Sequence, residues 1–165
     1  SALLAQQIVS RSTHDVDILA RRDWHGGVDV AFPMPEALKE AALQVADELR
    51  LGRNWLNSAA SMHFPDLHLL PASFWQELET RDYGHHLRIS FVTRSGQIQL
   101  KIYATLNRAE ARDFEDLRAL APDARESEDA LRWLIASFPG LPHLDRLPNL
   151  LTYLGHDDLI TQFAG

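Results

Sequence analysis

Apolar and polar positions alternate in several short segments of the chain, and this alternation predicts strands. Leu87, Ile89 and Phe91 occupy every second position of residues 87–92. A period of two places these side chains on one face of a strand. Shorter strands are expected around residues 15–17 and 28–30.

A helical period dominates the rest of the sequence. Prolines 33 and 35 precede a segment from 36 to 51 in which apolar residues recur at helical spacing: Leu38, Ala41, Ala42, Val45 and Leu49. This segment is expected to be a packing helix. Prolines and glycines divide the remaining sequence into further helices. The expected helices cover residues 1–7, 36–51, 54–62, 97–108, 110–121, 125–138, 146–154 and 157–163, with a turn at 24–27.

These elements predict a single α+β domain over residues 1–165, with a small mixed sheet followed by a helical C-terminal half. A chain of this length buries a core without covalent staples. The composition, 45% hydrophobic and 24% charged, is that of an ordinary globular protein. The absence of cysteine excludes disulfides and thiolate metal sites. Without a membrane-length apolar run or a leader, a cytoplasmic protein with no membrane contact is expected.

The net charge of −7 argues against extensive nucleic-acid binding, because phosphate contacts depend on clustered Lys and Arg. Arg21 and Arg22 are candidates for a local basic patch, although scattered arginines also solubilise a surface. The eight histidines lack the spacing of a zinc site, and the adjacent His85 and His86 would face opposite ways in a strand.

Asp15 and Asp17 form the first candidate site. Two residues apart in a strand, their carboxylates point the same way, while Val16 and Ile18 are expected to enter a core. Mg²⁺ is bound by one or two carboxylates together with water and substrate phosphates, so the pair indicates a metal and nucleotide site. The alternative is a solvated strand face, which has the same pattern.

The second candidate site lies in the helical half. On a helix, Lys101 shares a face with Ala104, Thr105 and Arg108, and the carboxylates Asp113 and Asp116 are one turn apart. A lysine and carboxylates near a metal site suit phosphoryl chemistry, in which the lysine offsets transition-state charge and a carboxylate orients or deprotonates the attacking hydroxyl. Alternatively, Lys101 is a snorkelling surface lysine, and Arg112 forms an ordinary helical ion pair with Asp116.

In order and spacing these motifs resemble the minimal nucleotidyltransferases of the polymerase-beta-like superfamily, in the branch of the AbiEii/MenT-type toxins and related bacterial proteins. That branch has Gly-Ser, then Asp-x-Asp on a strand, then Lys-Leu-x-Ala on a helix, then Asp-x-x-Asp. The counterparts here, over roughly residues 1–121, are Ser1, Asp15-Val16-Asp17, Lys101-Ile102-Tyr103-Ala104 and Asp113-Phe114-Glu115-Asp116. The family's glycine, and the strand and helix before it, have no counterpart, so we expect a domain that lacks these N-terminal elements.

The resemblance implies a nucleotidyltransferase-like fold and transfer of a nucleoside monophosphate from a nucleoside triphosphate to a hydroxyl. Asp15 and Asp17 would bind Mg²⁺ (or Mn²⁺) with the triphosphate, and Asp113 would act near the attacking group. Asp29 is the nearest strand acid to serve as a third metal carboxylate. The implied catalytic residues are Asp15, Asp17, Lys101 and Asp113, and the implied nucleotide-binding residues are Ser1, Thr13, Lys101 and Asp116.

Acceptors in this superfamily include transfer-RNA ends, protein side chains and small molecules, and the acidic charge favours local contact over extensive RNA wrapping. Two alternatives to an active enzyme follow from the same residues. The first is a catalytically degenerate nucleotidyltransferase-fold binding module, such as a subunit of a toxin–antitoxin pair with an antitoxin-type protein partner. The second is a structural domain whose acidic pairs only solvate the surface.

Overall fold

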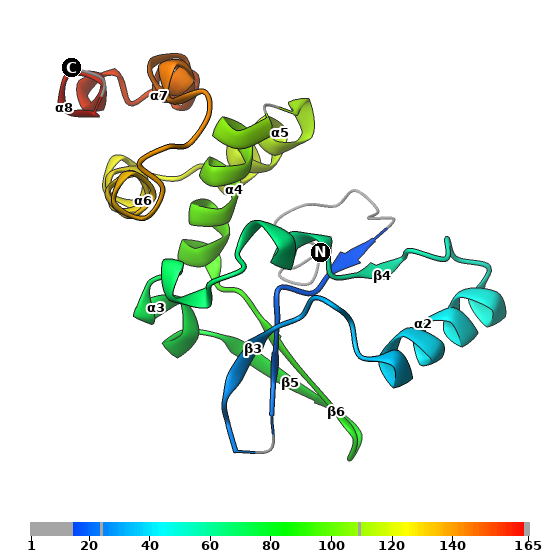
Figure 1. Ribbon diagram of the computed structural model, residues 1–165. Coiled ribbons are helices and arrows are strands. Elements are labelled where there is room, and N and C mark those ends of the chain that lie inside the picture. The colour runs from blue at the N-terminus through cyan, green and yellow to red at the C-terminus, as the bar shows by residue number, and fades with distance from the viewer. Residues whose placement is uncertain (1–14, 24, 109, 164–165) are drawn as a thin grey trace. The chain divides into compact units, whose positions relative to one another are not determined.

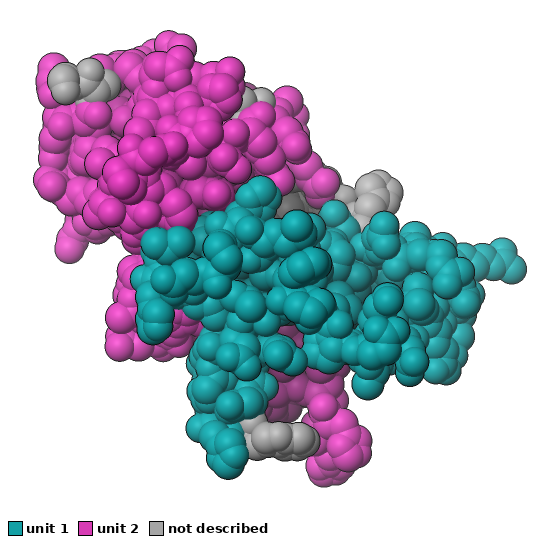
Figure 2. Space-filling model, in the orientation of Figure 1, with its two compact units in different colours: residues 1, 3–5, 10–70 teal, residues 2, 6–9, 71–165 magenta. Residues whose placement is uncertain are grey.

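A computed structural model describes residues 15–23, 25–108 and 110–163, shown in Figure 1. The sequence predicts one domain over residues 1–165, whereas the described chain divides into two compact units. Unit 1 ends at Leu70 and unit 2 begins at Pro71 (Figure 2, teal and magenta). The α+β composition is confirmed. Among the described residues, no helix combines the length and apolar character needed to cross a membrane.

Unit 1 contains short strands and one long helix. Strand β1 (Val16–Asp17) pairs in parallel with β4 (Leu56–Asn57), and β2 (Ala20–Arg22) pairs antiparallel with β3 (Val28–Val30). Helix α2 spans Glu36–Leu49, and 3₁₀ turns cover Ala59–His63 and Leu67–Leu69. The strand at 28–30 is confirmed, and β2 was not expected from the sequence.

The helix expected over residues 54–62 is wrong for its first half. Leu56 and Asn57 are extended because they pair with β1, and Ile18 N donates to Asn57 O at 2.7 Å. The Asn57 side chain then accepts a hydrogen bond from Ala59 N at 2.9 Å. Asparagine favours such local turns over helix interiors, so a 3₁₀ turn replaces the expected α-helix.

Helix α2 confirms the expected packing helix, with a shifted inward face. Ala42 and Ala46 are buried, whereas Leu49 is 66% exposed. The helix ends because Arg50 adopts the left-handed conformation at φ 56°. Leu51 N then donates a hydrogen bond to Ala46 O. Trp55 Nε1 donates to Ala42 O at 2.8 Å and fastens the segment before β4 to the helix.

Unit 2 begins with a short helix and a hairpin and continues as a set of helices (Figure 1). The expected strand at 87–92 and the helices after residue 96 are confirmed, while α3 and β5 were not expected. The elements are α3 (Ala72–Gln76), β5 (Glu79–Tyr83), β6 (Leu87–Phe91), α4 (Arg94–Arg108), α5 (Ala111–Leu120), α6 (Ala124–Ser137), a 3₁₀ turn (Leu144–Arg146), α7 (Leu147–Leu154), a 3₁₀ turn (Asp157–Leu159) and α8 (Ile160–Phe163).

The described strands form three separate two-stranded sheets, so the expected single mixed sheet is wrong. Each antiparallel strand pairs with its neighbour along the chain, β2 with β3 and β5 with β6. Such hairpins close through short local turns. The parallel pair is limited to two residues in each strand.

The core of unit 2 is built where α4 packs on α5 and α6. Leu117, Leu131 and Leu134 have no exposed surface, and Ile102 and Leu106 on α4 are 1% exposed. A capping box begins α6, in which Asp123 Oδ1 accepts from Glu126 N at 2.8 Å and Glu126 Oε2 accepts from Asp123 N at 3.0 Å. These reciprocal bonds fix the start of the helix that covers α4.

Gly96, in the first turn of α4, provides a test of how α4 packs against α3 and the residue that follows β6. A Cβ atom at this position would lie 2.5 Å from Val92 Cγ1 and 2.9 Å from the buried Phe74 ring. Gly96→Ala is therefore expected to lower the free energy of unfolding by about 1–3 kcal/mol, because overpacking forces neighbours off their rotamers. Gly140→Ala is the control, since nothing lies within 4 Å of that position. Equal urea midpoints for the two variants would contradict the packing.

Candidate functional site

Four charged side chains form a cluster between α4 and α5. Lys101 Nζ lies 3.0 Å from Asp113 Oδ1 and 2.6 Å from Asp116 Oδ2. Two guanidinium nitrogens of Arg108 donate to Asp113, Nε to Oδ2 at 2.8 Å and Nη2 to Oδ1 at 3.1 Å. Two cations from one helix thus meet two carboxylates from the next. We name these residues, Lys101, Arg108, Asp113 and Asp116, the ion cluster.

The helical period of the sequence positions the members of the ion cluster. Lys101 and Arg108 are seven residues, or two turns, apart on α4, and Asp113 and Asp116 are one turn apart on α5. The expected shared faces are therefore confirmed on both helices. The connection from Arg108 to the start of α5 at Ala111 is short, so the end of α4 lies next to the first turn of α5.

The carboxylates of the ion cluster are more deeply buried than its cations. The side chains of Asp113 and Asp116 are 1% and 3% exposed, whereas those of Lys101 and Arg108 are 24% and 46% exposed. Buried ionised carboxylates cost several kcal/mol unless they are paired and hydrogen-bonded, and here each has a cation in direct contact. Lys101 is therefore an anchored lysine, and the alternative of a free snorkelling side chain is wrong.

The charges in the ion cluster set the protonation of Asp113. Burial acts to raise the pKa of this carboxyl, but the hydrogen bonds and positive charges of Arg108 and Lys101 outweigh it and hold the pKa below its ordinary value. Asp113 thus stays ionised in the folded protein to a lower pH than in the unfolded chain.

Asp15 and Asp17 belong to unit 1, and the ion cluster belongs to unit 2. Asp15 immediately precedes β1, and Asp17 is the exposed last residue of that strand. The expectation that Val16 enters a core is wrong, because this side chain is 37% exposed in a strand of two residues with one pairing partner. Ser1 and Thr13, the other expected nucleotide-binding residues, lie outside the described residues.

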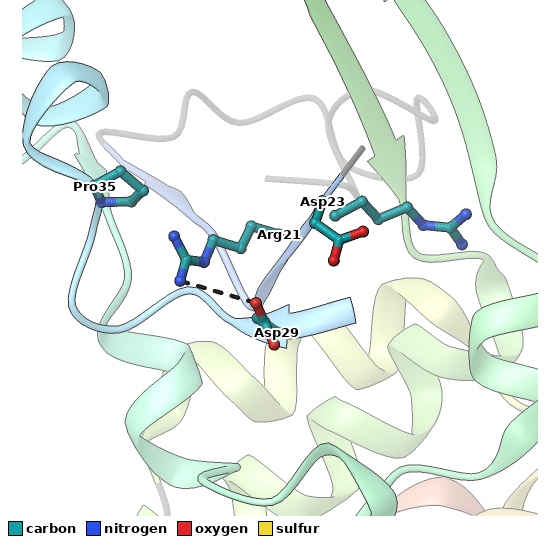
Figure 3. A pocket seen from close by; sticks show the side chains of 5 residues that line it. Arg21, Asp23, Asp29 and Pro35 are labelled. Atoms are coloured by element: carbon teal, nitrogen blue, oxygen red, sulfur yellow. Dashed lines mark ion pairs between the residues drawn. The ribbon is translucent and has the colours of Figure 1, made fainter. Parts of the chain in front are cut away.

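Asp29 lies in the β2–β3 hairpin and faces Arg21 across the strands, with 3.9 Å between Arg21 Nη2 and Asp29 Oδ2 (Figure 3). Both residues line an open hollow of about 480 Å³ together with Arg22, Asp23 and Pro35. Asp23 closes the hairpin turn, since its Oδ1 accepts from His25 N and Gly27 N. The carboxylates of this hairpin thus serve its own turn and its cross-strand ion pair.

Neither unit gathers three or more His, Asp or Glu side chains into a metal site among the residues described. A cation held by Asp15 and Asp17 would therefore draw its remaining ligands from water and phosphate oxygens. Mg²⁺ accepts such a mixed set, since it is commonly bound through one or two carboxylates and the substrate's phosphates. The donor chemistry of the pair fits this group.

Arg108 is the member of the ion cluster that the sequence motifs did not assign to the site. The available signal was its position two helical turns after Lys101, on the same face. Comparisons of the chain with protein-family models, with curated proteins and with solved structures returned no match.

Asp113→Asn tests the energetics of the ion cluster. Removing one charge of a buried pair costs about 3–5 kcal/mol, and we expect a loss near the lower limit because both cations can turn toward solvent. Because the folded-state pKa of Asp113 is lowered, its stabilising contribution is present above its unfolded pKa of about 3.9 and is lost as the pH falls through the folded value.

Urea unfolding of wild type and Asp113→Asn from pH 7 to pH 2 measures this contribution. The two free energies of unfolding are expected to differ at neutral pH and to converge in acid. Asp129→Asn, at an exposed position of α6, is the control and should follow the wild-type curve. A gap between wild type and Asp113→Asn that persists unchanged below pH 3 would contradict an ionised Asp113.

Proposed function

We propose that the protein is a Mg²⁺-dependent nucleotidyltransferase that moves a nucleoside monophosphate from a nucleoside triphosphate to a hydroxyl acceptor. The observation that carries this proposal is the contact of Lys101 with Asp113 and Asp116. These residues come from two motifs that resemble the family's Lys-Leu-x-Ala and Asp-x-x-Asp. Their meeting in one ion cluster supports a common role for the two motifs.

In the proposed function the carboxylates of Asp15 and Asp17 bind the metal, and Asp17 is open to solvent. Bound Mg²⁺ (or Mn²⁺) would neutralise phosphate charge and orient the triphosphate. In the transfer step the acceptor oxygen forms a bond to the α-phosphorus, and the bond between that phosphorus and the α–β bridging oxygen breaks. Pyrophosphate leaves with the bonding electrons, and the hydroxyl proton passes to water.

Lys101 supplies the positive charge of the proposed site. Its side chain is partly exposed while two carboxylates hold its ammonium, so the nitrogen is fixed before substrate arrives. Fixed charges stabilise a transition state well because they need no reorganisation during the reaction. Asp116 acts in this scheme through its contact with Lys101.

The proposed acceptor is an RNA end, such as that of a transfer RNA, a protein hydroxyl or a small molecule. The net charge of −7 favours an acceptor held by local contacts. The three hydrogen bonds that Lys101 and Arg108 donate to the buried Asp113 favour a second candidate function, that of a degenerate nucleotidyltransferase-fold module which binds an antitoxin-type partner. Mg²⁺-dependent triphosphate binding and transfer separate the two candidates.

The double variant Asp15→Asn/Asp17→Asn tests the metal and nucleotide site. A ligand at 100 times its dissociation constant stabilises a protein by about 2.7 kcal/mol, which raises the melting temperature by several degrees. Wild type is expected to show this increase with Mg²⁺ and at least one of ATP, GTP, CTP and UTP, and the double variant is expected to lose it. Thermal melts with and without Mg²⁺ measure the effect.

Asp47→Asn is the matched control, because Asp47 is an exposed carboxylate on α2 of the same unit. It should keep the Mg²⁺-dependent increase. An equal increase in the double variant would remove Asp15 and Asp17 from nucleotide binding.

Lys101→Ala separates transition-state stabilisation from binding. If Lys101 acts mainly on charge that develops during transfer, its removal lowers kcat much more than it raises KM for the triphosphate. Transfer of label from α-³²P triphosphates to total transfer RNA or to protein measures both constants. Lys39→Ala, at an exposed lysine of α2, is the control. Unchanged kcat in Lys101→Ala would exclude this role.

A further inference from the structure

Arg108 makes the most extensive contact with Asp113 in the ion cluster. Its guanidinium donates through Nε to Oδ2 and through Nη2 to Oδ1, and Lys101 Nζ donates to the same Oδ1. Forked contacts of this type fix both the position and the plane of a carboxylate. The Asp113 side chain is 1% exposed. Asp113 is therefore oriented by Arg108 and shielded from solvent.

This arrangement limits what Asp113 can do in a reaction. Both of its oxygens accept hydrogen bonds within the ion cluster, and the carboxylate has almost no surface open to a ligand. A carboxylate with two cationic partners is also a weak proton acceptor. Asp113 thus has a geometry suited to holding Lys101 rather than to deprotonating an acceptor hydroxyl.

Charge balance explains why the ion cluster needs a second cation. Asp113 and Asp116 are one turn apart and buried, so their negative charges repel across a low-dielectric interface. Lys101 Nζ contacts both carboxylates, so Asp113 and Asp116 share this ammonium. With Arg108 present, Asp113 has its own cation, and Lys101 can remain between Asp113 and Asp116.

We propose that Arg108 is a positioning residue for the proposed transfer: it fixes Asp113, and Asp113 with Asp116 holds the Lys101 ammonium, which supplies positive charge to the transferred phosphate. This inference rests on the function proposed above. Among the residues that the structure describes, the charged groups around Asp113 include Lys101 and Arg108 from α4, Asp116 on its own helix and Glu110, whose Oε1 lies 3.8 Å from Arg108 Nε. Arg108 acts on transfer through Asp113 and Lys101, without touching the reacting atoms.

The first experiment compares Arg108→Gln and Arg108→Lys in the transfer assay with the four α-³²P triphosphates. Arg108→Gln is expected to lower kcat by roughly 10- to 100-fold, because small displacements of a charged group at a reaction centre have effects of this size. KM for the triphosphate should change much less. Arg108→Lys restores one positive charge and should recover part of the lost kcat.

The pH dependence of kcat distinguishes positioning from a merely structural contact. Without Arg108, the Asp113 carboxyl loses a cation that favours its ionised form, so it becomes protonated at a higher pH than in wild type. The acidic limb of the kcat profile is therefore expected to move to higher pH in Arg108→Gln. Loss of a structural contact would lower the melting temperature and leave this limb in place.

Arg88→Gln is the matched control for Arg108→Gln. Arg88 also makes a forked contact with an aspartate, to Asp82 at 2.6 and 3.3 Å, but these two side chains are 70% and 60% exposed on the β5–β6 hairpin. Its removal eliminates the same type of ion pair in the same unit without touching the ion cluster. Unchanged kcat and an unchanged pH profile are expected.

Because the sequence has two lysines, NMR of their side chains tests the proposal independently of activity. Lys39 and Lys101 are the two lysines of the sequence, so ¹⁵N-lysine labelling gives two ammonium signals. Lys39 pairs with Glu36 at 3.5 Å on the exposed side of α2 and serves as the internal reference. Arg108→Gln is expected to shift the Lys101 signal and to leave the Lys39 signal unchanged. Arg88→Gln should shift neither.

A shifted Lys101 signal together with reduced kcat and a displaced acidic limb supports the proposal. An unchanged Lys101 signal, or unchanged kcat in Arg108→Gln, overturns it while leaving the proposed transfer intact. If wild type transfers no nucleotide, the proposed function and the role of Arg108 in transfer both fail, and a shifted Lys101 signal then identifies a structural cluster. Should Arg108→Gln fail to fold, Arg108→Ala replaces it and is judged by the same three criteria.

Discussion

The burial of two carboxylates at the α4–α5 interface is the constraint on which the helical part of unit 2 depends. Asp113 and Asp116 require cations at fixed positions, and Lys101 and Arg108 provide them two turns apart on the facing helix. Leucine and isoleucine side chains alone would tolerate a shift of one helix along the other more readily. The ion pairs add directional contacts between α4 and α5 to those of the apolar core.

The helices of unit 2 could be predicted because local sequence decides them. Proline and glycine separate segments with a helical period, and α4 to α7 lie close to the expected ranges. The shared face of Asp113 and Asp116 follows from the same period. The forked contact from Arg108 could not be predicted, because it joins two helices across a break and depends on their packing.

Unlike the helices, two of the strands form because of their pairing partners and not because of their local sequence. β6 has an apolar alternation and was expected, whereas β5 reads Glu-Thr-Arg-Asp-Tyr and has none. This strand forms because cross-strand partners support it, Asp82 with Arg88 and Thr80 with Ser90, and because the Arg81 guanidinium lies over the Phe91 ring. Such pairs stabilise a sheet without any hydrophobic pattern in the strand itself. β4 likewise depends on pairing with β1.

The two candidate sites differ in what the fold requires of them. The ion cluster pairs two buried carboxylates and also holds Lys101, so helix packing and the proposed transfer both use it. The exposed carboxylate of Asp17 makes little contribution to packing, because a two-residue strand needs no negative charge at its surface. Under the proposed function, the acidic pair of Asp15 and Asp17 has a role in metal binding. An anchored lysine gives chemistry a fixed charge, whereas the proposed function also needs the metal ligands that Asp15 and Asp17 would supply.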